Sequence, residues 1–369
     1  MKKLLVRYIL PALAIILLAW FFVKITEGKV QNPPLNTDTI QTQVLPKSPT
    51  PTPSPITPSS HIIPIRLHTF QTFNNCGPAT LSMILSYLDI NVSQQTLGQS
   101  LRPYQNPRGD NDDKSVTLQE LATEAQKYNL LPYHRPNGNI QILKQFIANG
   151  IPVITRTLTK PTEDIGHYRL VRGYDDTTGQ IIQDDSLQNK NLRFSYGDFT
   201  RLWQDFNFEY LVLVPKEKEE VVEGILGEDI DEKMAWQKAA ESSEAILAQN
   251  PNDTVARFNL SVALYNIGDF QGSVREFEKV ENRLPFRTLW YQIEPVQAYF
   301  ELGNYDRVFQ LTDKILSNYN RAFSELYLIR GEIYKKKGRL DLAKTEFEKA
   351  VLYNKNLKSA QEALGSLSS

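Results

Sequence analysis

A short motif recurs at a fixed interval near the carboxyl end of the chain, and it constrains the fold more than any other feature. A glycine, a polar or charged residue and an apolar residue stand together at three places, 35 residues apart (268 to 303 and 303 to 338): Gly268-Asp269-Phe270, Gly303-Asn304-Tyr305 and Gly338-Arg339-Leu340. A period of about this length indicates stacked units, each of which buries its apolar face only against its neighbours. This part of the chain is therefore predicted to be a repeat array.

The units resemble the tetratricopeptide (TPR) repeat. The last unit shows the spacing of two packed helices most clearly, with Tyr327, Gly331, Tyr334, Ala343, Phe347 and Ala350. The first unit keeps Leu260, Phe277 and Pro285, and the middle unit is the most divergent. We expect an all-α TPR solenoid over residues 233–369, with the second helix of an earlier unit at 234–249 and a capping helix within 356–369. The resemblance implies a groove for a peptide or protein partner, which we favour over a purely bracing role.

Charge balance and cysteine count exclude several classes of protein. Lys and Arg number 41 against 42 Asp and Glu, so the chain has no basic footprint and no nucleic-acid partner is expected. Cys76 is the only cysteine, which excludes a disulfide within the chain and a Cys-rich zinc site. In an exported protein an unpaired thiol suggests a reactive role, although many free cysteines are small buried apolar residues.

The amino terminus has the pattern of a membrane anchor. Lys2, Lys3 and Arg7 precede an apolar run that ends at Val23 and reaches 20 residues when it is counted from Leu4, against about 20 for a membrane span. Residues 1–30 are predicted to be a transmembrane anchor with the amino terminus inside and the folded domains extracytoplasmic. A cleaved signal peptide is the alternative, but bulky residues at 20–22 stand where a cleavage site would need small ones.

Residues 31–60 are predicted to be a linker. The stretch from Pro46 to Ser60 consists mainly of Pro, Thr and Ser and has almost no large apolar residues. Such a segment cannot form a core and behaves as an extended, semi-rigid spacer. It would hold a domain away from the bilayer.

Folded patterning then covers residues 61–215. Helices are expected first (77–88, 118–128 and 140–149) and strands later (151–157, 167–174, 180–184 and 210–214). This order favours an α+β domain with a sheet packed against the first helix. Residues 216–232 are acidic and poorly patterned, which suggests a linker or a short helix between this domain and the repeats.

Cys76 lies where the first helix begins. Gly77 and Pro78 follow it, and proline is well tolerated in a first helical turn. The exposed N–H groups and the dipole of a helix start favour the thiolate, which is the nucleophilic form. Gln71, five residues upstream, could donate its amide N–H to an oxyanion that forms beside the sulfur. The alternative is a capped helix with a buried cysteine and a solvated Gln71.

A candidate base and acid follow on two strands. His167 opens the strand Gly166-His167-Tyr168, and the turn at 174–179 predicts a hairpin. The end of the second strand would then lie beside His167, so that Asp184 or Asp185 could orient the imidazole. Side chains alternate along a strand, so only one of the two carboxylates can face the histidine.

The order of these residues resembles papain-like cysteine peptidase family 39, which includes bacteriocin-processing peptidases. The resemblance covers about residues 61–215 and rests on Gln71, Cys-Gly-Pro-Ala-Thr at 76–80 and Gly-His-Tyr at 166–168. It implies Cys76 as nucleophile, His167 as base, Asp185 as acid and Gln71 in the oxyanion hole, with no metal or cofactor. Ser186 stands where the family usually has proline, which keeps Asp184 open as the acid. Asp175 and Asp176 are interpreted as turn residues.

Three functions compete on this basis. The first is a membrane-anchored cysteine peptidase that hydrolyses peptide bonds in a peptide or protein substrate. The second is a catalytically silent, peptidase-like protein that binds peptides and acts as a scaffold. The third, less favoured, transfers an acyl group to an amine. Peptide-bond hydrolysis is the leading hypothesis, because a binding module has no need of Cys76, His167 and Gln71 together.

Overall fold

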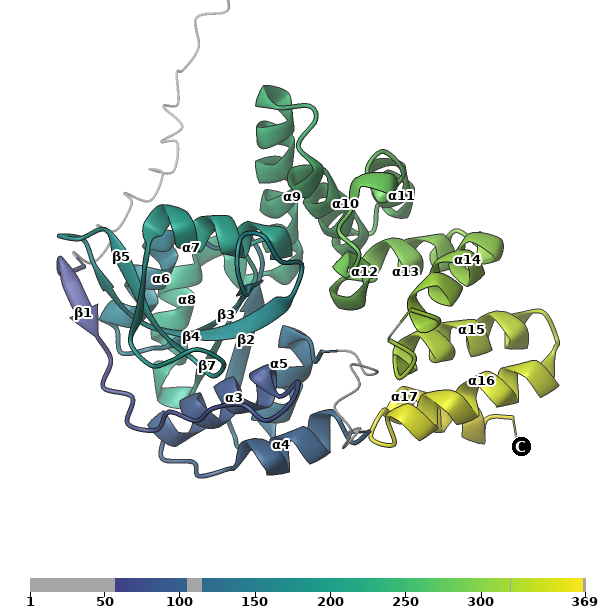
Figure 1. The fold of residues 1–369 in the computed structure, drawn as a ribbon, viewed down its shortest axis with the longest axis horizontal. Coiled ribbons are helices and arrows are strands. Elements are labelled where there is room, and N and C mark those ends of the chain that lie inside the picture. The colour runs from purple at the N-terminus through teal and green to yellow at the C-terminus, as the bar shows by residue number, and fades with distance from the viewer. Residues whose placement is uncertain (1–56, 105–114, 319, 368–369) are drawn as a thin grey trace, which may run out of the picture. The chain divides into compact units, whose positions relative to one another are not determined.

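The computed structural model describes residues 57–104, 115–318 and 320–367 (Figure 1). The predicted anchor at 1–30 and most of the linker at 31–60 lie outside these residues. None of the helices within the described ranges is long and apolar enough to cross a membrane. Residues from Ile56 to Ser369 cluster into one compact unit. It contains a mixed α/β domain followed by helical repeats.

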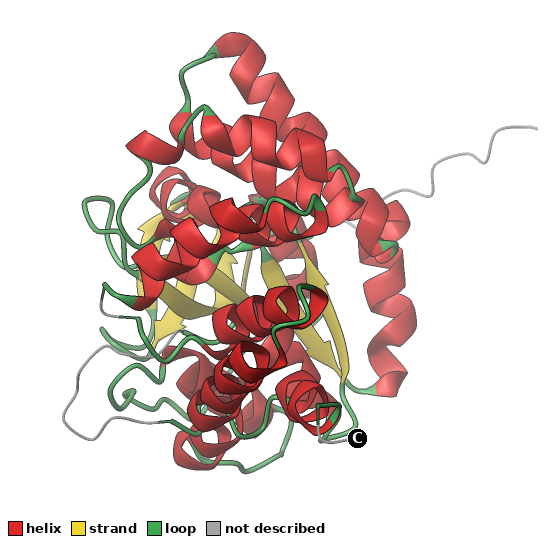
Figure 2. Ribbon diagram, turned by 90° about the vertical axis from the view of Figure 1, so that its right-hand side faces the viewer, coloured by secondary structure: helices red, strands yellow, loops and turns green. Residues whose placement is uncertain are grey.

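The α/β domain is built on one antiparallel sheet. Its strands run in the order β2-β7-β3-β4-β5-β6, and β1 pairs with the end of β4. The bounds are β1 Ser60–Ile62, β2 Leu131–Arg135, β3 Val153–Leu158, β4 Gly166–Asp175, β5 Gln180–Asp185, β6 Leu192–Ser195 and β7 Tyr210–Val214. The central strands β3, β4 and β7 are almost completely buried, because helices cover the sheet on both sides (Figures 1 and 2).

The helix that begins at Cys76 packs directly on β4. It is α3, Cys76–Tyr87, and all its residues from Cys76 to Leu85 are buried. A Cβ added to Gly77 would lie 2.4 Å from Val116 Cγ2, so only glycine allows this approach. The other helices of the domain are α4 Gln94–Leu101, α5 Leu118–Gln126, α6 Ile140–Ala148, α7 Tyr196–Trp203 and α8 Glu219–Leu226.

Several elements were not expected from the sequence. Strands β2 and β6 are short and only partly buried, and α4 and α7 have eight residues each, so their patterns are weak. At residues 216–232, expected as a linker or a short helix, the structure has helix α8. Val222 and Leu226 of this helix are buried in the core of the α/β domain. The segment is therefore part of that domain rather than a free connection.

The described part of the repeat region consists of helices joined by short turns and loops. Its helices are α9 Glu232–Gln249, α10 Thr254–Ile267, α11 Phe270–Glu278, α12 Thr288–Tyr291, α13 Glu294–Glu301, α14 Tyr305–Leu316, α15 Ser324–Lys336, α16 Leu340–Tyr353 and α17 Lys358–Gly365. Gly268, Gly303 and Gly338 have φ values of +92°, +72° and +70°. Each ends one helix in the left-handed conformation that favours glycine, which explains the 35-residue recurrence. In the first two repeats the next residue, Asp269 or Asn304, caps the following helix.

The repeat region also packs against the α/β domain. Just before α12, Arg287 Nη1 lies 2.6 Å from Asp164 Oδ1 in the turn between β3 and β4. Near the last helix, α17, Asn356 Nδ2 donates to the carbonyl oxygen of Ser100 in α4 at 2.8 Å. Between the domains, the Arg156 guanidinium lies 5.0 Å from the ring centres of both Phe206 and Tyr291. The two parts therefore share a buried interface.

Glu294 makes this interface sensitive to pH. Its Oε2 atom is buried without a hydrogen-bond partner, and burial, followed by the charge of Glu209, raises the pKa of Glu294 to about 7 from 4.5. Between pH 4.5 and pH 7, Glu294 is ionised in the unfolded state but stays protonated in the folded state. The free energy of unfolding therefore falls as pH rises, and the fall is complete above pH 7. We expect Glu294→Gln to raise the free energy of unfolding by about 1–3 kcal/mol at pH 8 and to change it little at pH 4.5.

Urea unfolding of the full chain at the two pH values measures this difference. The matched control is Glu348→Gln, whose side chain is 55% exposed and should leave the midpoint unchanged at either pH. Equal stabilisation by Glu294→Gln at both pH values would contradict a carboxylate that is forced to ionise inside the interface.

Candidate active site

Cys76 is the first residue of α3, and the start of that helix lacks a side-chain cap. Asn75 occupies the N-cap position but makes no capping hydrogen bond. Its side chain donates instead to Thr72 Oγ1 at 2.7 Å and accepts from Arg102 Nη1 at 2.9 Å. The first-turn N–H groups of α3 are thus not satisfied by a side chain at the N-cap, and they surround the sulfur with positive potential.

His167 is held by the carboxylate of the neighbouring strand. The pairing register sets Asp185 of β5 opposite Arg169 of β4, on the face that His167 shares with Arg169. His167 Nε2 lies 2.8 Å from Asp185 Oδ1. With Nε2 engaged, Nδ1 is the ring nitrogen left for Cys76, and each of these two residues shifts the pKa of the other. The structure therefore places His167 between Cys76 and Asp185, where it interacts with both.

Asp184 lies on the other face of β5. Its Oδ2 atom is 3.0 Å from Arg172 Nη1, and its Oδ1 accepts from the backbone N–H of Asn191 at 2.8 Å. Both contacts are structural, and neither involves His167. Of the two carboxylates left open by the sequence, the structure places Asp185 against the imidazole.

The charges of these groups support one another. Burial raises the pKa of Cys76, but the hydrogen bond and charge of His167, the backbone of Tyr168 and the charge of Arg102 outweigh it, so the pKa lies below 9.0. Burial lowers the pKa of His167, but Asp185 and Cys76 raise it above 6.5. Burial raises the pKa of Asp185, while His167 and Arg169 bring it below 3.8. A thiolate–imidazolium pair is the charge state that these shifts favour.

Gln71 is attached to the loop that follows Asp185. Its backbone N–H donates to the Ser186 carbonyl oxygen at 2.8 Å, and the Ser186 hydroxyl donates to Gln71 Oε1 at 2.9 Å. Because the serine engages the amide oxygen, the amide NH₂ remains available as a donor. Ser186, which departs from the usual proline of the family, therefore orients the residue expected in the oxyanion hole.

Two arginines of the site were not expected from the sequence. Arg169 Nε lies 3.1 Å from Asp185 Oδ2, and the guanidinium is fully buried. Its position two residues after His167 on a strand is a signal that could have revealed it. Arg102 donates to the Asn74 carbonyl oxygen at 2.6 Å, and its charge helps to lower the pKa of Cys76. No sequence pattern points to Arg102, because only the fold brings it to the start of α3.

The electrostatics predict how alkylation of Cys76 depends on pH. We expect iodoacetamide to label Cys76 at neutral pH, since its pKa is lowered. His167→Ala removes the largest lowering influence and leaves burial, which raises the pKa. Labelling at pH 7 should then fall about tenfold for each unit by which the pKa rises. Mass spectrometry measures the rate directly, because the chain has only one cysteine.

The two neighbouring carboxylates provide matched variants. Asp185→Asn should lower the pKa of His167 and so alter the pH profile of labelling. Asp184→Asn breaks a buried ion pair, so it should reduce the stability of the fold. The pH profile of Cys76 labelling, measured on folded protein, should stay as in the wild type. Identical pH profiles of labelling in the wild type and in His167→Ala would contradict the proposed Cys76–His167 pair.

Comparison with known proteins gives two family matches. Residues 59–211 match the model described as "Peptidase_C39 like family", and residues 324–357 match the tetratricopeptide repeat model. For these residues the matches confirm the resemblances inferred from the motifs. The comparison with curated proteins gives no significant match.

Solved structures with detectable similarity fall into the same two groups. A putative C39-like peptidase from Bacillus anthracis is 17% identical with a TM-score of 0.35, over 42% of this chain and 98% of that one. The peptidase domain of Streptococcus ComA, a bifunctional ABC transporter, is 21% identical with a TM-score of 0.33, over 41% and 99%. A TPR protein of Thermus thermophilus is 19% identical with a TM-score of 0.30, over 38% and 77%.

Proposed function

We propose that this protein is a cysteine peptidase that uses Cys76, His167, Asp185 and Gln71. The observation that carries the proposal is that His167, which lies 2.8 Å from Asp185 Oδ1, lowers the pKa of the Cys76 thiol. The pKa shifts of Cys76, His167 and Asp185 all favour the charged form of the group. The C39-like family match over residues 59–211 supports the same reading.

The reaction follows from these positions. The Cys76 thiolate attacks the carbonyl carbon of a peptide bond, and the oxygen becomes an oxyanion near the start of α3 and the Gln71 amide. His167 gives its proton to the leaving amine, which departs and leaves a thioester. Water then attacks the thioester while His167 accepts a proton, so that a carboxylic acid and the thiolate are released. Asp185 stabilises the imidazolium throughout and holds its orientation.

The alternative is a catalytically silent protein that binds peptides. The near-complete burial of Cys76 (4% exposed) and His167 (2% exposed) favours it, because a substrate must reach the sulfur. The lowered pKa of Cys76 opposes it, since a binding protein has no use for a thiolate. Acyl transfer to an amine would use the same thioester with another acceptor.

Profiling of peptide cleavage distinguishes these functions. The full chain and its Cys76→Ala variant are incubated with a peptide library, and new termini are identified by mass spectrometry. We expect cleavage by the wild type alone. Identical product sets from both proteins would favour the silent alternative, and products extended by an added amine would favour acyl transfer.

Gln71 and Ser186 have separable effects on a cleaved peptide. Gln71→Ala removes an oxyanion donor, so kcat should fall about 10²–10³-fold while alkylation of Cys76 stays unchanged. Ser186→Ala frees the Gln71 amide to rotate, so kcat should fall by a smaller factor with little change in KM. The control is Thr178→Ala, in the exposed turn between β4 and β5. An unchanged kcat in Gln71→Ala would remove this residue from the oxyanion hole.

We further propose that residues 1–30 anchor the chain, that the folded domains are extracytoplasmic, and that the repeats bind a protein or peptide partner. The basic residues before the apolar run support the orientation, and the TPR match at 324–357 supports the partner. Protease treatment of intact cells and of lysed cells tests the orientation. Digestion of the domains only after lysis would place them inside the cell.

A further inference from the structure

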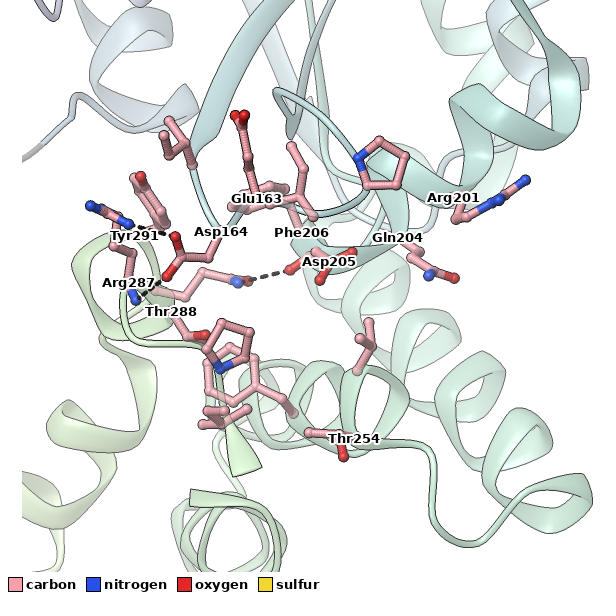
Figure 3. A pocket seen from close by; sticks show the side chains of 18 of the residues that line it. Glu163, Asp164, Arg201, Gln204, Asp205, Phe206, Thr254, Arg287, Thr288 and Tyr291 are labelled. Carbon is pink, nitrogen blue, oxygen red and sulfur yellow. Dashed lines mark hydrogen bonds and ion pairs between the residues drawn. The ribbon is translucent and has the colours of Figure 1, made fainter. Parts of the chain in front are cut away.

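A large cavity lies between the α/β domain and the repeats, and Cys76 is not among its lining residues. Its volume is ≈ 790 Å³, which is within the usual range of about 300–1,000 Å³ for ligand sites. The turn between β3 and β4, the end of α7, the start of α10 and residues 284–292 form its walls (Figure 3). We call it the junction pocket.

Much of the wall is apolar. Phe206 and Phe258 lie behind the wall, with 2% and 3% of their surfaces exposed. The accessible apolar surface comes from Ile165, which is 41% exposed, and from the half-buried Val255 and Leu284. Residues of both domains thus supply a surface on which an apolar side chain could pack.

The cations near the pocket already have partners. Arg287 Nη1 and its backbone N–H contact the two carboxylate oxygens of Asp164 at 2.6 and 3.0 Å (Figure 3). Arg201 Nη2 contacts Asp198 Oδ1 at 2.9 Å. No cation of the described residues remains unpaired on the wall.

Two acceptors of the wall are not matched by a cation or by a full set of donors. The Asp205 carboxylate contacts no cation of the described chain, and burial, with the nearby Asp253, raises the pKa of Asp205 to about 6. Gln292 is 3% exposed; its Nε2 donates to the Asp205 carbonyl oxygen at 3.0 Å, but its Oε1 is buried without a partner. A carboxylate and an amide oxygen on one wall match the donors of a Lys or Arg side chain.

We propose that the junction pocket binds a peptide segment in which an apolar side chain adjoins Lys or Arg. The basic group meets Asp205 and Gln292, and the apolar side chain packs on Ile165, Val255 and Leu284. A peptide fits better than a small amine, because the cavity is large and its apolar wall extends beyond the acidic group. This site is independent of whether Cys76 turns over.

The pocket also adjoins the strand that carries His167. Tyr291 lines it, and a Cβ added to Gly166 would lie 3.2 Å from the Tyr291 ring. Gly166 immediately precedes His167 at the start of β4. Only the ring of Tyr291 would therefore separate a bound peptide from Gly166, the residue before His167.

Binding of two fluorescein-labelled peptides to the full chain tests the proposal. Gly-Phe-Lys-Gly and its neutral match, with norleucine in place of lysine, are titrated by fluorescence anisotropy. The protein carries Cys76→Ala, so the result does not depend on the proposed peptidase activity. We expect the lysine peptide to bind about tenfold tighter at pH 7.5 and to lose this advantage below pH 6, as Asp205 becomes protonated.

A pair of variants on neighbouring positions makes the test specific. Asp205→Asn should abolish the preference for lysine without loss of folding, because it removes a half-buried carboxylate that has no cationic partner. Asp198→Asn, whose side chain is 59% exposed and lies off the pocket, should keep the preference. Equal affinity for the two peptides, no binding of either, or an unchanged preference in Asp205→Asn would each overturn the proposal. Displacement of the lysine peptide by spermidine at equal concentration would also overturn it, in favour of a small-amine site.

Discussion

The buried carboxylate of Asp185 is the contact on which the candidate site depends. One of its oxygens faces His167 and also accepts from the backbone N–H groups of Leu187 and Gln188, and the other lies 3.1 Å from Arg169 Nε. An isolated carboxylate in this interior would be costly, and the hydrogen bonds to the first oxygen and the ion pair at the second together offset that cost. Because side chains alternate along a strand, a slip of one residue in the β4–β5 pairing would exchange Asp185 for Asp184 on this face.

The same loop connects the acid to the other side of the site. The Asp185 carbonyl oxygen lies 3.0 Å from His68 Nε2, and Ser186 holds both the backbone and the side chain of Gln71. The segment before α3 is therefore attached to the end of β5, and it leads directly to Cys76. The four candidate residues come from three places in the sequence, but hydrogen bonds join the segments that carry them, so their geometry is set jointly.

The repeat region is part of this assembly rather than a distant appendage. Tyr291 packs beside Gly166, and Arg156 of β3 lies between aromatic rings of both domains. The interface also contains Glu294 and Asp205, whose pKa values are raised chiefly by burial. Acidic groups with raised pKa values reduce the stability of the fold near neutral pH. Such destabilising groups are common at surfaces that serve binding rather than packing.

The sequence by itself determined the local features of this protein. The helix that begins at Cys76, the β4–β5 hairpin and the 35-residue repeat follow from glycine, proline and apolar spacing, which act over a few residues. Only the tertiary structure decided which of Asp184 and Asp185 faces His167. It also decided the position of Arg102 at the start of α3, the contact of Ser186 with Gln71, and the junction pocket. Each of these depends on which segments pack side by side, and pairing between distant segments leaves no periodic signal in a single sequence.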